Sequence, residues 1–283
     1  MILSDELRSW IGRTRVLEED VGLGMTRRIA AMLDLDPMGF RPGDELPSHW
    51  FAMYFTEAAR QSDLGPDGHP APGVLLPPIA LPRRMGAGRR VTLHGSMRVG
   101  EMLSKTIEVA AIEPKQARTG FITVLTMRHT IRRGDDVLAV DEFDAVYREA
   151  VRPGEKSTVN VPVPAPADPA WSVVRHLPSS LLFRYSAVTW NAHRIHYDAD
   201  YTRDEEGYPD VVQNGGLTMQ LLLDAVVGHT PGVLRGFTAR LTRPIHVNET
   251  ITLAGHAPVD GVVRAWIANA QGALCGQVEA SFG

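Results

Sequence analysis

The chain of 283 residues has a single cysteine, Cys275, and this scarcity excludes two kinds of structure. One thiol cannot form a disulfide within the chain or build a zinc site from four cysteines. The thiol lies in the apolar segment A-L-C-G-Q-V, where we expect it to be buried and inert. The sequence also lacks a secretory signal and any apolar run near the ~20 residues of a membrane span, so we expect a cytoplasmic protein with no membrane partner.

Positively charged residues are outnumbered, because the chain has 29 lysines and arginines and 33 acidic residues. The net charge of -4 argues against a protein that works by binding nucleic acid. Three arginine pairs are local exceptions, and they fit either a solvated face or a site for an anionic ligand. The pairs lie at 83–84, 89–90 and 132–133.

Two common motifs are missing as well. The absence of G-x-S-x-G disfavours a serine hydrolase. The segment G-L-G-M-T-R-R at 22–28 contains glycines, but it follows no convincing strand and does not complete a dinucleotide-binding fingerprint. Neither class of enzyme is expected.

What the chain does contain is two halves that resemble each other around a proline-rich segment. Prolines at 162, 164, 166 and 169 exclude both a helix and a central strand there. We therefore expect an extended, stiff linker over 156–170. It separates a first unit over 1–155 from a second unit over 171–283.

Each half is predicted to contain one buried helix followed by a run of strands. Helical spacing of apolar residues marks 47–60, with Ser48 as a possible cap, and also marks 215–228. The segments that follow are rich in Val, Ile, Thr and Phe. We predict strands over 91–98, 102–113, 119–132 and 136–148, and over 233–243, 249–257, 261–270 and 273–282.

Short matches between the halves indicate an internal repeat. Val99, Glu101 and Leu103 correspond to Val247, Glu249 and Ile251 at a constant offset of 148 residues. A long helix followed by an antiparallel sheet is an α+β arrangement, and a sheet curled around such a helix is a hot-dog fold. We predict a double hot-dog whose two sheets join edge to edge, which removes exposed strand edges.

A dense polar segment, N-A-H-R-I-H-Y-D at 191–198, precedes the second helix. It follows F-R-Y-S-A-V-T-W at 183–190, which we interpret as a strand, and it is followed by E-G-Y-P at 206–209. These motifs resemble the MaoC-like, or type 2, enoyl-thioester hydratases, which carry D-x-N-P-x-H and then H-G at the helix start. The similarity is greatest to the double hot-dog branch that includes mesaconyl-C4-CoA and itaconyl-CoA hydratases.

The resemblance implies roles for individual residues. The family's aspartate falls on Asn191, its asparagine on His193 and its histidine on His196, while H-G and the next small residue fall on 214–216. An amide does not take up protons at neutral pH, so Asn191 departs from the family pattern. We expect His196 to be the main acid/base and Asn191 to hold water or substrate.

Hydration of a double bond conjugated to a thioester suits these residues. A histidine moves protons near neutral pH, and backbone N–H groups at a helix start stabilise the developing enolate oxygen. Gly215 and Gly216 are predicted to let the thioester approach that backbone. Asn214 is interpreted as the helix N-cap.

Several roles stay open. His193 either shares the proton transfer or orients the loop, and Asp198 either sets a histidine tautomer or satisfies loop backbone groups. Arg184 and Arg194 are candidates for binding an acyl carboxylate or coenzyme phosphates, or they face solvent, and Tyr185 is a further candidate for substrate binding. The histidine pair with Asp198 lacks a third ligand at a recognisable spacing, so no metal is expected.

The resemblance implies an enoyl-CoA hydratase for a short branched dicarboxylic acyl-CoA, either itaconyl-CoA or mesaconyl-C4-CoA. It implies a coenzyme A thioester as substrate, no separate cofactor and a homodimer. The first half lacks the polar motif and is expected to shape the pocket. A fatty-acid-type (3R)-hydroxyacyl-thioester dehydratase and a non-catalytic acyl-thioester-binding subunit are the alternatives.

Overall fold

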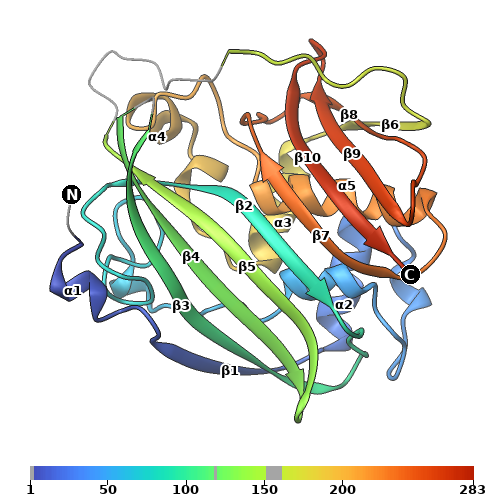
Figure 1. Cartoon of the computed structure of the whole chain (residues 1–283), viewed down its shortest axis with the longest axis horizontal. Coiled ribbons are helices and arrows are strands. Elements are labelled where there is room, and N and C mark those ends of the chain that lie inside the picture. Colours follow the sequence, from blue (N-terminus) through green and yellow to red (C-terminus); the bar gives the residue numbers. More distant parts are fainter. Residues whose placement is uncertain (1–2, 118–119, 151–160) are drawn as a thin grey trace.

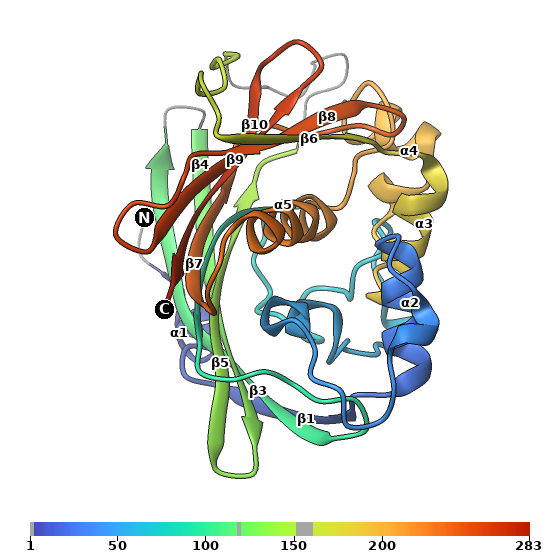
Figure 2. The same ribbon diagram turned by 90° about the vertical axis from the view of Figure 1, so that its right-hand side faces the viewer.

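The computed structural model describes residues 3–117, 120–150 and 161–283, so the predicted linker segment 156–160 lies outside the described residues. One antiparallel sheet of ten strands curls around a central helix, α5 (Gly215–His229) (Figure 1, Figure 2). The strand order is β1-β3-β4-β5-β2-β7-β10-β9-β8-β6. Among the described residues, no helix is long and apolar enough to cross a membrane.

Each half contributes five strands, and the halves join where β2 pairs antiparallel with β7. The predicted edge-to-edge junction is therefore confirmed. The first half supplies β1 (Thr14–Asp20), β2 (Arg83–Leu93), β3 (Met102–Ala117), β4 (Gly120–Arg133) and β5 (Asp136–Arg148). The second half supplies β6 (Trp171–His176), β7 (Leu234–Leu241), β8 (Thr250–Gly255), β9 (Val262–Asn269) and β10 (Leu274–Phe282).

The remaining elements are short, and most of them lie on the open side of the curled sheet (Figure 2). The α-helices are α1 (Asp5–Arg8), α2 (Leu23–Met32), α3 (Ser179–Val188) and α4 (Ala199–Asp204). The 3-10 helices are η1 (Pro37–Gly39), η2 (Ser48–Met53), η3 (Gln61–Asp63) and η4 (Arg194–His196).

The internal repeat is confirmed by matching backbone contacts. Gly100 and Asn248, which are 148 residues apart, both have a left-handed backbone, with φ of 91° and 62°. The amide of Gly100 donates to the carbonyl of Val21 at 2.8 Å, and the amide of Asn248 donates to the carbonyl of Leu177 at 2.7 Å. The same turn thus ties the start of β3 and of β8 to the chain that follows β1 and β6.

Helix α5 is held by its apolar residues. Leu217, Leu222 and Val226 are fully buried and belong to the main core cluster. Complete burial of such a side chain contributes roughly 1.5–3 kcal/mol to folding. A polar contact also joins the halves, because His49 Nε2 of η2 lies 2.7 Å from Asp224 Oδ1 of α5.

The predicted helix over 47–60 was wrong. Only the 3-10 helix η2 forms there, and the chain turns extended at Tyr54 and left-handed at Phe55, with φ of 58°. Trp50, Phe51 and Met53 are buried together with both of these aromatic residues. The apolar spacing therefore reflected burial on several sides of one turn, and tertiary packing decided the local structure.

Two further local predictions were wrong. Residues 183–190, predicted as a strand, lie mostly in α3, because Leu182, Tyr185 and Val188 are buried at three-residue intervals that define one helical face. The strand predicted over 91–98 is β2, which begins at Arg83 and ends at Leu93. Its glycines at 86 and 88 had hidden its first part from the pattern.

Candidate active site

His196 ends η4 and is held in one tautomer. Its Nδ1 lies 2.7 Å from the carbonyl oxygen of Val212, which can only accept, so Nδ1 carries the proton. Nε2 is then left with a lone pair. The side chain is 8% exposed, and burial lowers its pKa to about 4. At neutral pH His196 is therefore an uncharged proton acceptor.

Asn191 and Asn214 form a chain of amides between the segment 191–198 and the start of α5. Asn191 Nδ2 donates to Asn214 Oδ1 at 2.9 Å, and Asn191 Oδ1 accepts from the amide of His193 at 3.0 Å. Asn214 Nδ2 donates to Ser186 Oγ at 2.9 Å. Asn214 occupies the N-cap position of α5, but its side chain does not cap the helix, so that predicted role is corrected. The amides instead tie the polar segment 191–198, called the motif loop below, to α3 and α5.

His193 lies between two other imidazoles. Its ring lies against that of His69 at a centroid distance of 3.9 Å, tilted by 34°, and meets the ring of His196 edge-on at 5.4 Å. Burial, followed by the charges of His69, His196 and Arg84, lowers the pKa of His193 far below its usual range. His193 is consequently neutral under physiological conditions.

The glycines at the start of α5 make room for protein side chains. A β-carbon on Gly216 would lie 2.3 Å from the hydroxyl oxygen of Tyr185, and one on Gly215 would lie 2.6 Å from Leu241 Cδ1. Packing against Tyr185 and Leu241 therefore explains these two glycines as well as the predicted approach of a thioester does. Burial raises the pKa of Tyr185 to about 12, so its hydroxyl keeps its proton next to the helix start.

Asp198 has a structural role rather than the predicted tautomer-setting one. Its Oδ1 accepts from the amide of Tyr201 at 3.0 Å, which caps α4. Its Oδ2 accepts from Arg194 Nε and Nη2 at 3.0 and 2.8 Å. The carbonyl of Val212 sets the His196 tautomer instead.

The two predicted substrate arginines lie elsewhere. Besides Asp198, Arg194 contacts the carbonyl of Pro66 at 3.0 Å, and its guanidinium stacks 4.0 Å from the Tyr201 ring. Arg184 is exposed and lines a different cavity, of about 540 Å³, beside the middle and C-terminal end of α5. The structure does not bring either arginine to His196.

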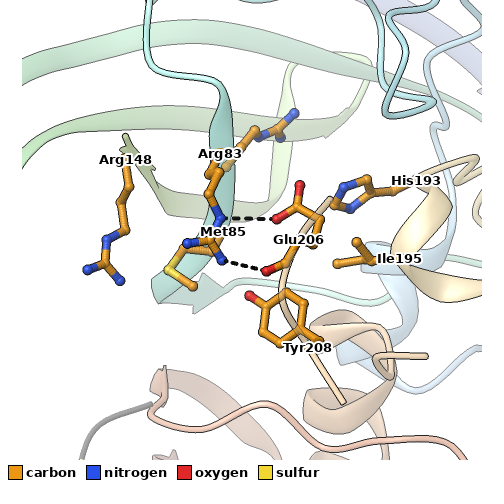
Figure 3. Close-up of a pocket in the computed structure, with 8 residues that line it drawn as sticks. Arg83, Met85, Arg148, His193, Ile195, Glu206 and Tyr208 are labelled. Carbon is orange, nitrogen blue, oxygen red and sulfur yellow. Dashed lines mark hydrogen bonds and ion pairs between the residues drawn. The ribbon is translucent and has the colours of Figure 1, made fainter. Parts of the chain in front are cut away.

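Sequence reasoning missed the residues that surround His193. A small pocket of about 10 Å³ lies beside it, and three arginines reach this pocket from β2 and β5 (Figure 3). Its lining is Arg83, Arg84, Met85, Arg148, His193, Ile195, Glu206 and Tyr208. Arg83 Nε donates to Glu206 Oε2 at 3.1 Å. The pair at 83–84 was the available sequence signal, whereas Arg89 and Arg90 of the next pair bind Asp141 and Asp144.

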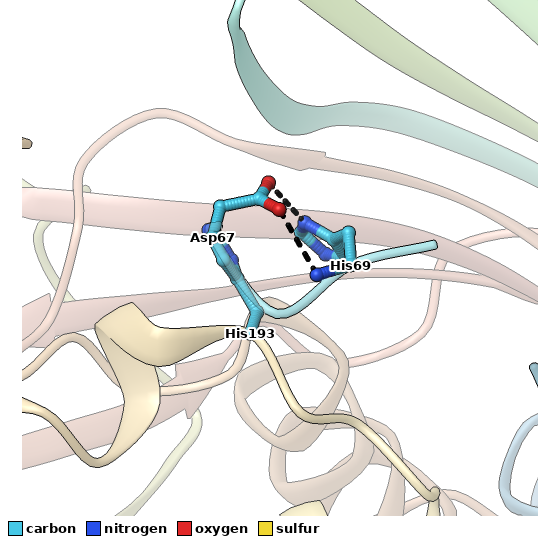
Figure 4. Close-up of side chains that lie close together, drawn as sticks. All are labelled: Asp67, His69 and His193. Atoms are coloured by element: carbon cyan, nitrogen blue, oxygen red, sulfur yellow. Dashed lines mark hydrogen bonds and ion pairs between the residues drawn. The ribbon is translucent and has the colours of Figure 1, made fainter. Parts of the chain in front are cut away.

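Asp67, His69 and His193 also gather closely (Figure 4). Among the described residues, one potential ligand atom from each lies within 4.8 Å of the others. This group differs from the set of His193, His196 and Asp198 that the sequence pattern brought into consideration and that was set aside there. The same positive charges that lower the pKa of His193, including that of Arg84, also disfavour a cation there.

The model of the family "Hydroxyacyl-thioester dehydratase type 2" matches residues 48–247, which include the motif loop and the start of α5. This chain belongs to that family. The Mesaconyl-C(4)-CoA hydratase of Chloroflexus aurantiacus is 37% identical over 246 residues, which are 86% of this chain and 86% of that protein.

Solved structures confirm the double hot-dog fold of this type 2 dehydratase. A MaoC-like dehydratase from Phytophthora capsici covers 100% of this chain and 98% of its own, with a TM-score of 0.74 and 14% identity. A Mycobacterium tuberculosis protein described as a double hotdog fold covers 96% of both chains, with a TM-score of 0.59 and 16% identity. At these identities the likeness concerns the fold alone.

The site of this member of the family combines two functional elements, a proton acceptor and a helix start that can stabilise an oxyanion. Nε2 of His196 can take a proton, and the start of α5 offers backbone N–H groups and a positive helix dipole to a developing oxyanion. These elements come from the second half of the chain. His69 and Asp67 reach the same neighbourhood from a loop of the first half.

Proposed function

We propose that this enzyme catalyses the reversible hydration of a short branched dicarboxylic enoyl-CoA, with mesaconyl-C4-CoA as the first candidate and itaconyl-CoA as the second. One observation carries the proposal: a neutral His196 is fixed by the carbonyl of Val212, three residues before α5 begins, in a chain that is 37% identical to a Mesaconyl-C(4)-CoA hydratase. The substrate is a coenzyme A thioester, and the reaction needs no further cofactor.

In this proposal, His196 Nε2 takes a proton from water while the water oxygen attacks the β-carbon. The electron pair of the double bond moves toward the thioester, whose oxygen gathers negative charge opposite the backbone N–H groups at the start of α5. The α-carbon then takes up a proton, which completes the 3-hydroxyacyl product. A positioned acid/base of this kind contributes about 10²- to 10⁴-fold to the rate.

The distal carboxylate of the acyl group needs a cationic partner. Arg84 and Arg148, which line the small pocket next to His193, suit this role better than Arg184 or Arg194. A guanidinium binds a carboxylate through two parallel hydrogen bonds. We expect Arg84→Met to raise KM for mesaconyl-C4-CoA and to leave KM for crotonyl-CoA nearly unchanged.

The test is a spectrophotometric assay that follows the loss of enoyl-thioester absorbance. Mesaconyl-C4-CoA, itaconyl-CoA, crotonyl-CoA and a long-chain 2-enoyl-CoA are compared on the purified chain. We expect the C4–C5 dicarboxylic thioesters to give the highest kcat/KM and His196→Ala to lower kcat by about 10²- to 10⁴-fold. His94→Gln, which changes an exposed histidine of the first half, is the matched control. Full activity of His196→Ala would refute the proposed base.

A second candidate is a fatty-acid-type (3R)-hydroxyacyl-thioester dehydratase. The cavity of about 540 Å³ beside α5 favours it, because apolar side chains such as Trp50, Leu221 and Leu253 line a space that suits a longer acyl chain. A higher kcat/KM for the long-chain 2-enoyl-CoA would select this candidate. Inactivity toward all four thioesters, with retained binding, would instead select the non-catalytic binding subunit.

The assembly and the compartment are proposals of the same kind. We propose a homodimer, which the resemblance implies, and a cytoplasmic location, in keeping with the single buried thiol of Cys275. Burial raises the pKa of that thiol to about 11, so it is unreactive at neutral pH. Light scattering on the purified chain measures the dimer, and cell fractionation measures the location.

A further inference from the structure

We propose that the first half of the chain supplies a second proton-transfer group to the active site: His69 is a catalytic residue, and Asp67 positions it. The inference rests on the proposed hydration reaction. It assigns to the half without the polar motif a direct part in the chemistry, carried by the loop 66–70.

This loop docks on the motif loop through backbone contacts. The amide of Arg194 donates to the carbonyl of Asp67 at 2.8 Å, and Arg194 Nη1 donates to the carbonyl of Pro66 at 3.0 Å. Gly68, which follows Asp67, has φ of +85°, and a β-carbon there would lie 2.0 Å from the carbonyl oxygen of Ala192. Only glycine allows this approach, so the two loops fit each other at one fixed position.

Within the docked loop, Asp67 fixes His69. Asp67 Oδ1 accepts from the amide of His69 at 3.0 Å, and its Oδ2 lies 3.0 Å from His69 Nδ1 (Figure 4). The carboxylate therefore accepts a hydrogen bond from the Nδ1–H group of His69 and directs Nε2 away from itself. A carboxylate paired with an imidazole in this way fixes the ring orientation and leaves Nε2 as the atom that carries the transferable proton of the protonated ring.

The three imidazoles form a continuous row that crosses from one half to the other. The ring of His69 lies tilted against that of His193 at a centroid distance of 3.9 Å, and His193 meets His196 edge-on at 5.4 Å. The charge of His69 is also one cause of the lowered pKa of His196. With its side chain 21% exposed, His69 is open enough to exchange a proton with solvent, whereas its two neighbours are buried.

The reaction needs a proton donor for the α-carbon, and the described motif residues 191–196 of the second half offer proton acceptors or an amide in its place. Neutral His196 offers a lone pair at Nε2, Asn191 is an amide, and buried His193 is neutral. As the C–O bond forms at the β-carbon, the water proton goes to His196. The π electron pair passes to the α-carbon, which forms its C–H bond with the Nε2 proton of protonated His69. Exchange with solvent then returns both histidines to their starting states, and no electrons are gained or lost.

The experiment uses the full chain with mesaconyl-C4-CoA and crotonyl-CoA as substrates. We expect His69→Ala to lower kcat by about 100-fold and Asp67→Asn to lower it by about 10-fold, with melting temperatures close to that of the wild type. Added imidazole should partly restore His69→Ala, because it can occupy the vacated site and donate the proton. His69→Gln, of similar shape, provides a second variant if alanine impairs folding, and His94→Gln is the control.

The outcomes separate this inference from the function on which it rests. An active wild type with equally active His69→Ala and His69→Gln variants would overturn the inference alone. Lost activity that accompanies a large fall in melting temperature, without rescue by imidazole, would overturn it in favour of a structural role. Lost activity on treatment with EDTA, restored by Zn²⁺, would overturn it in favour of a metal at Asp67, His69 and His193. A wild type inactive on every thioester refutes both proposals.

Discussion

Each half of the molecule has five strands, but the two halves cover their strands differently. Val91 of β2 pairs with Phe237 of β7 at the junction. On its other side Val91 pairs with Asp141 of β5, and Phe237 pairs with Ala280 of β10. Asp141 and Ala280 therefore occupy equivalent places, and both are 0% exposed. The second half places an apolar residue there, under a long apolar helix. The first half places a carboxylate there.

The carboxylate is accommodated because the first half has a single 3-10 turn, η2, where the second has α5. Arg89 binds both oxygens of Asp141 at 2.7 and 2.8 Å, and His129 adds a contact at 3.1 Å. The chain between η2 and β2 runs over 54–82, whereas only 230–233 separates α5 from β7. A shortened helix thus goes together with a charged interior and a long loop that reaches the other half.

The largest effect is expected from the buried carboxylate. Asp141→Ala leaves the Arg89 guanidinium partly buried without its partner, which costs about 3–5 kcal/mol of the free energy of unfolding. Urea denaturation measures this loss. The double variant Asp141→Ala/Arg89→Met, which removes both charges, should recover much of it. A single variant as stable as the wild type would show that the charged interior of the first half is dispensable.

The next effect concerns the loop that joins the halves. Gly68→Ala places a β-carbon against the Ala192 carbonyl oxygen and should lower kcat by about 10- to 100-fold, because His69 and His193 lose their fixed contact. Gly73→Ala is the matched control. Its φ of +86° is equally strained, at a cost of about 1–2 kcal/mol, but its nearest neighbour is Pro78 at 3.9 Å. Equal kcat values for the two variants would contradict the docking.

Much of the second half could be predicted from its sequence because local pattern and tertiary environment agree there. Its four predicted strands and the helix beginning at Gly215 all form. The segment 47–60 has similar apolar spacing, yet its aromatic residues are buried on several sides, so packing rather than period decided its structure. Residues 183–190 combine β-branched and aromatic residues, but their buried positions define a helical face.

The candidate site divides along the same line. His196 was predictable because its motif is contiguous and lies just before the helix that completes the site. His69 was not, because its contact with His193 joins residues far apart in sequence, and P-D-G-H-P is typical of an ordinary turn. The half-buried Asp198 was assigned to a histidine by proximity in sequence, whereas Arg194, one helical turn away, binds it.

The buried His196 predicts that the free energy of unfolding depends on pH. The pKa of His196 is about 4 in the folded protein, below the value of about 6.5 for an unfolded chain. The unfolded state binds more protons between these values, so the free energy of unfolding falls as pH decreases. His196 alone accounts for about 2 kcal/mol between pH 8 and pH 5.

Urea denaturation at these two pH values checks the contribution of His196. In His196→Gln the fall should be smaller by about that amount, whereas His94→Gln should keep it in full. His193 contributes in the same direction, because its pKa is lowered as well. An unchanged fall in His196→Gln would mean that His196 is not held neutral by burial.

The smallest effect is expected from Asp198, although it lies in the motif itself. Asp198→Ala removes the cap of α4 and the partner of Arg194, but it leaves the Val212 carbonyl that holds His196. We therefore expect kcat to stay within about twofold of the wild type, where loss of the tautomer would cost about 10²-fold or more. Asp198→Asn, which can keep the cap but not the charge, separates the two contacts. Both variants leave the row of imidazoles in place. A large fall in kcat in either one would therefore show that Asp198 acts on the histidines of the motif loop after all.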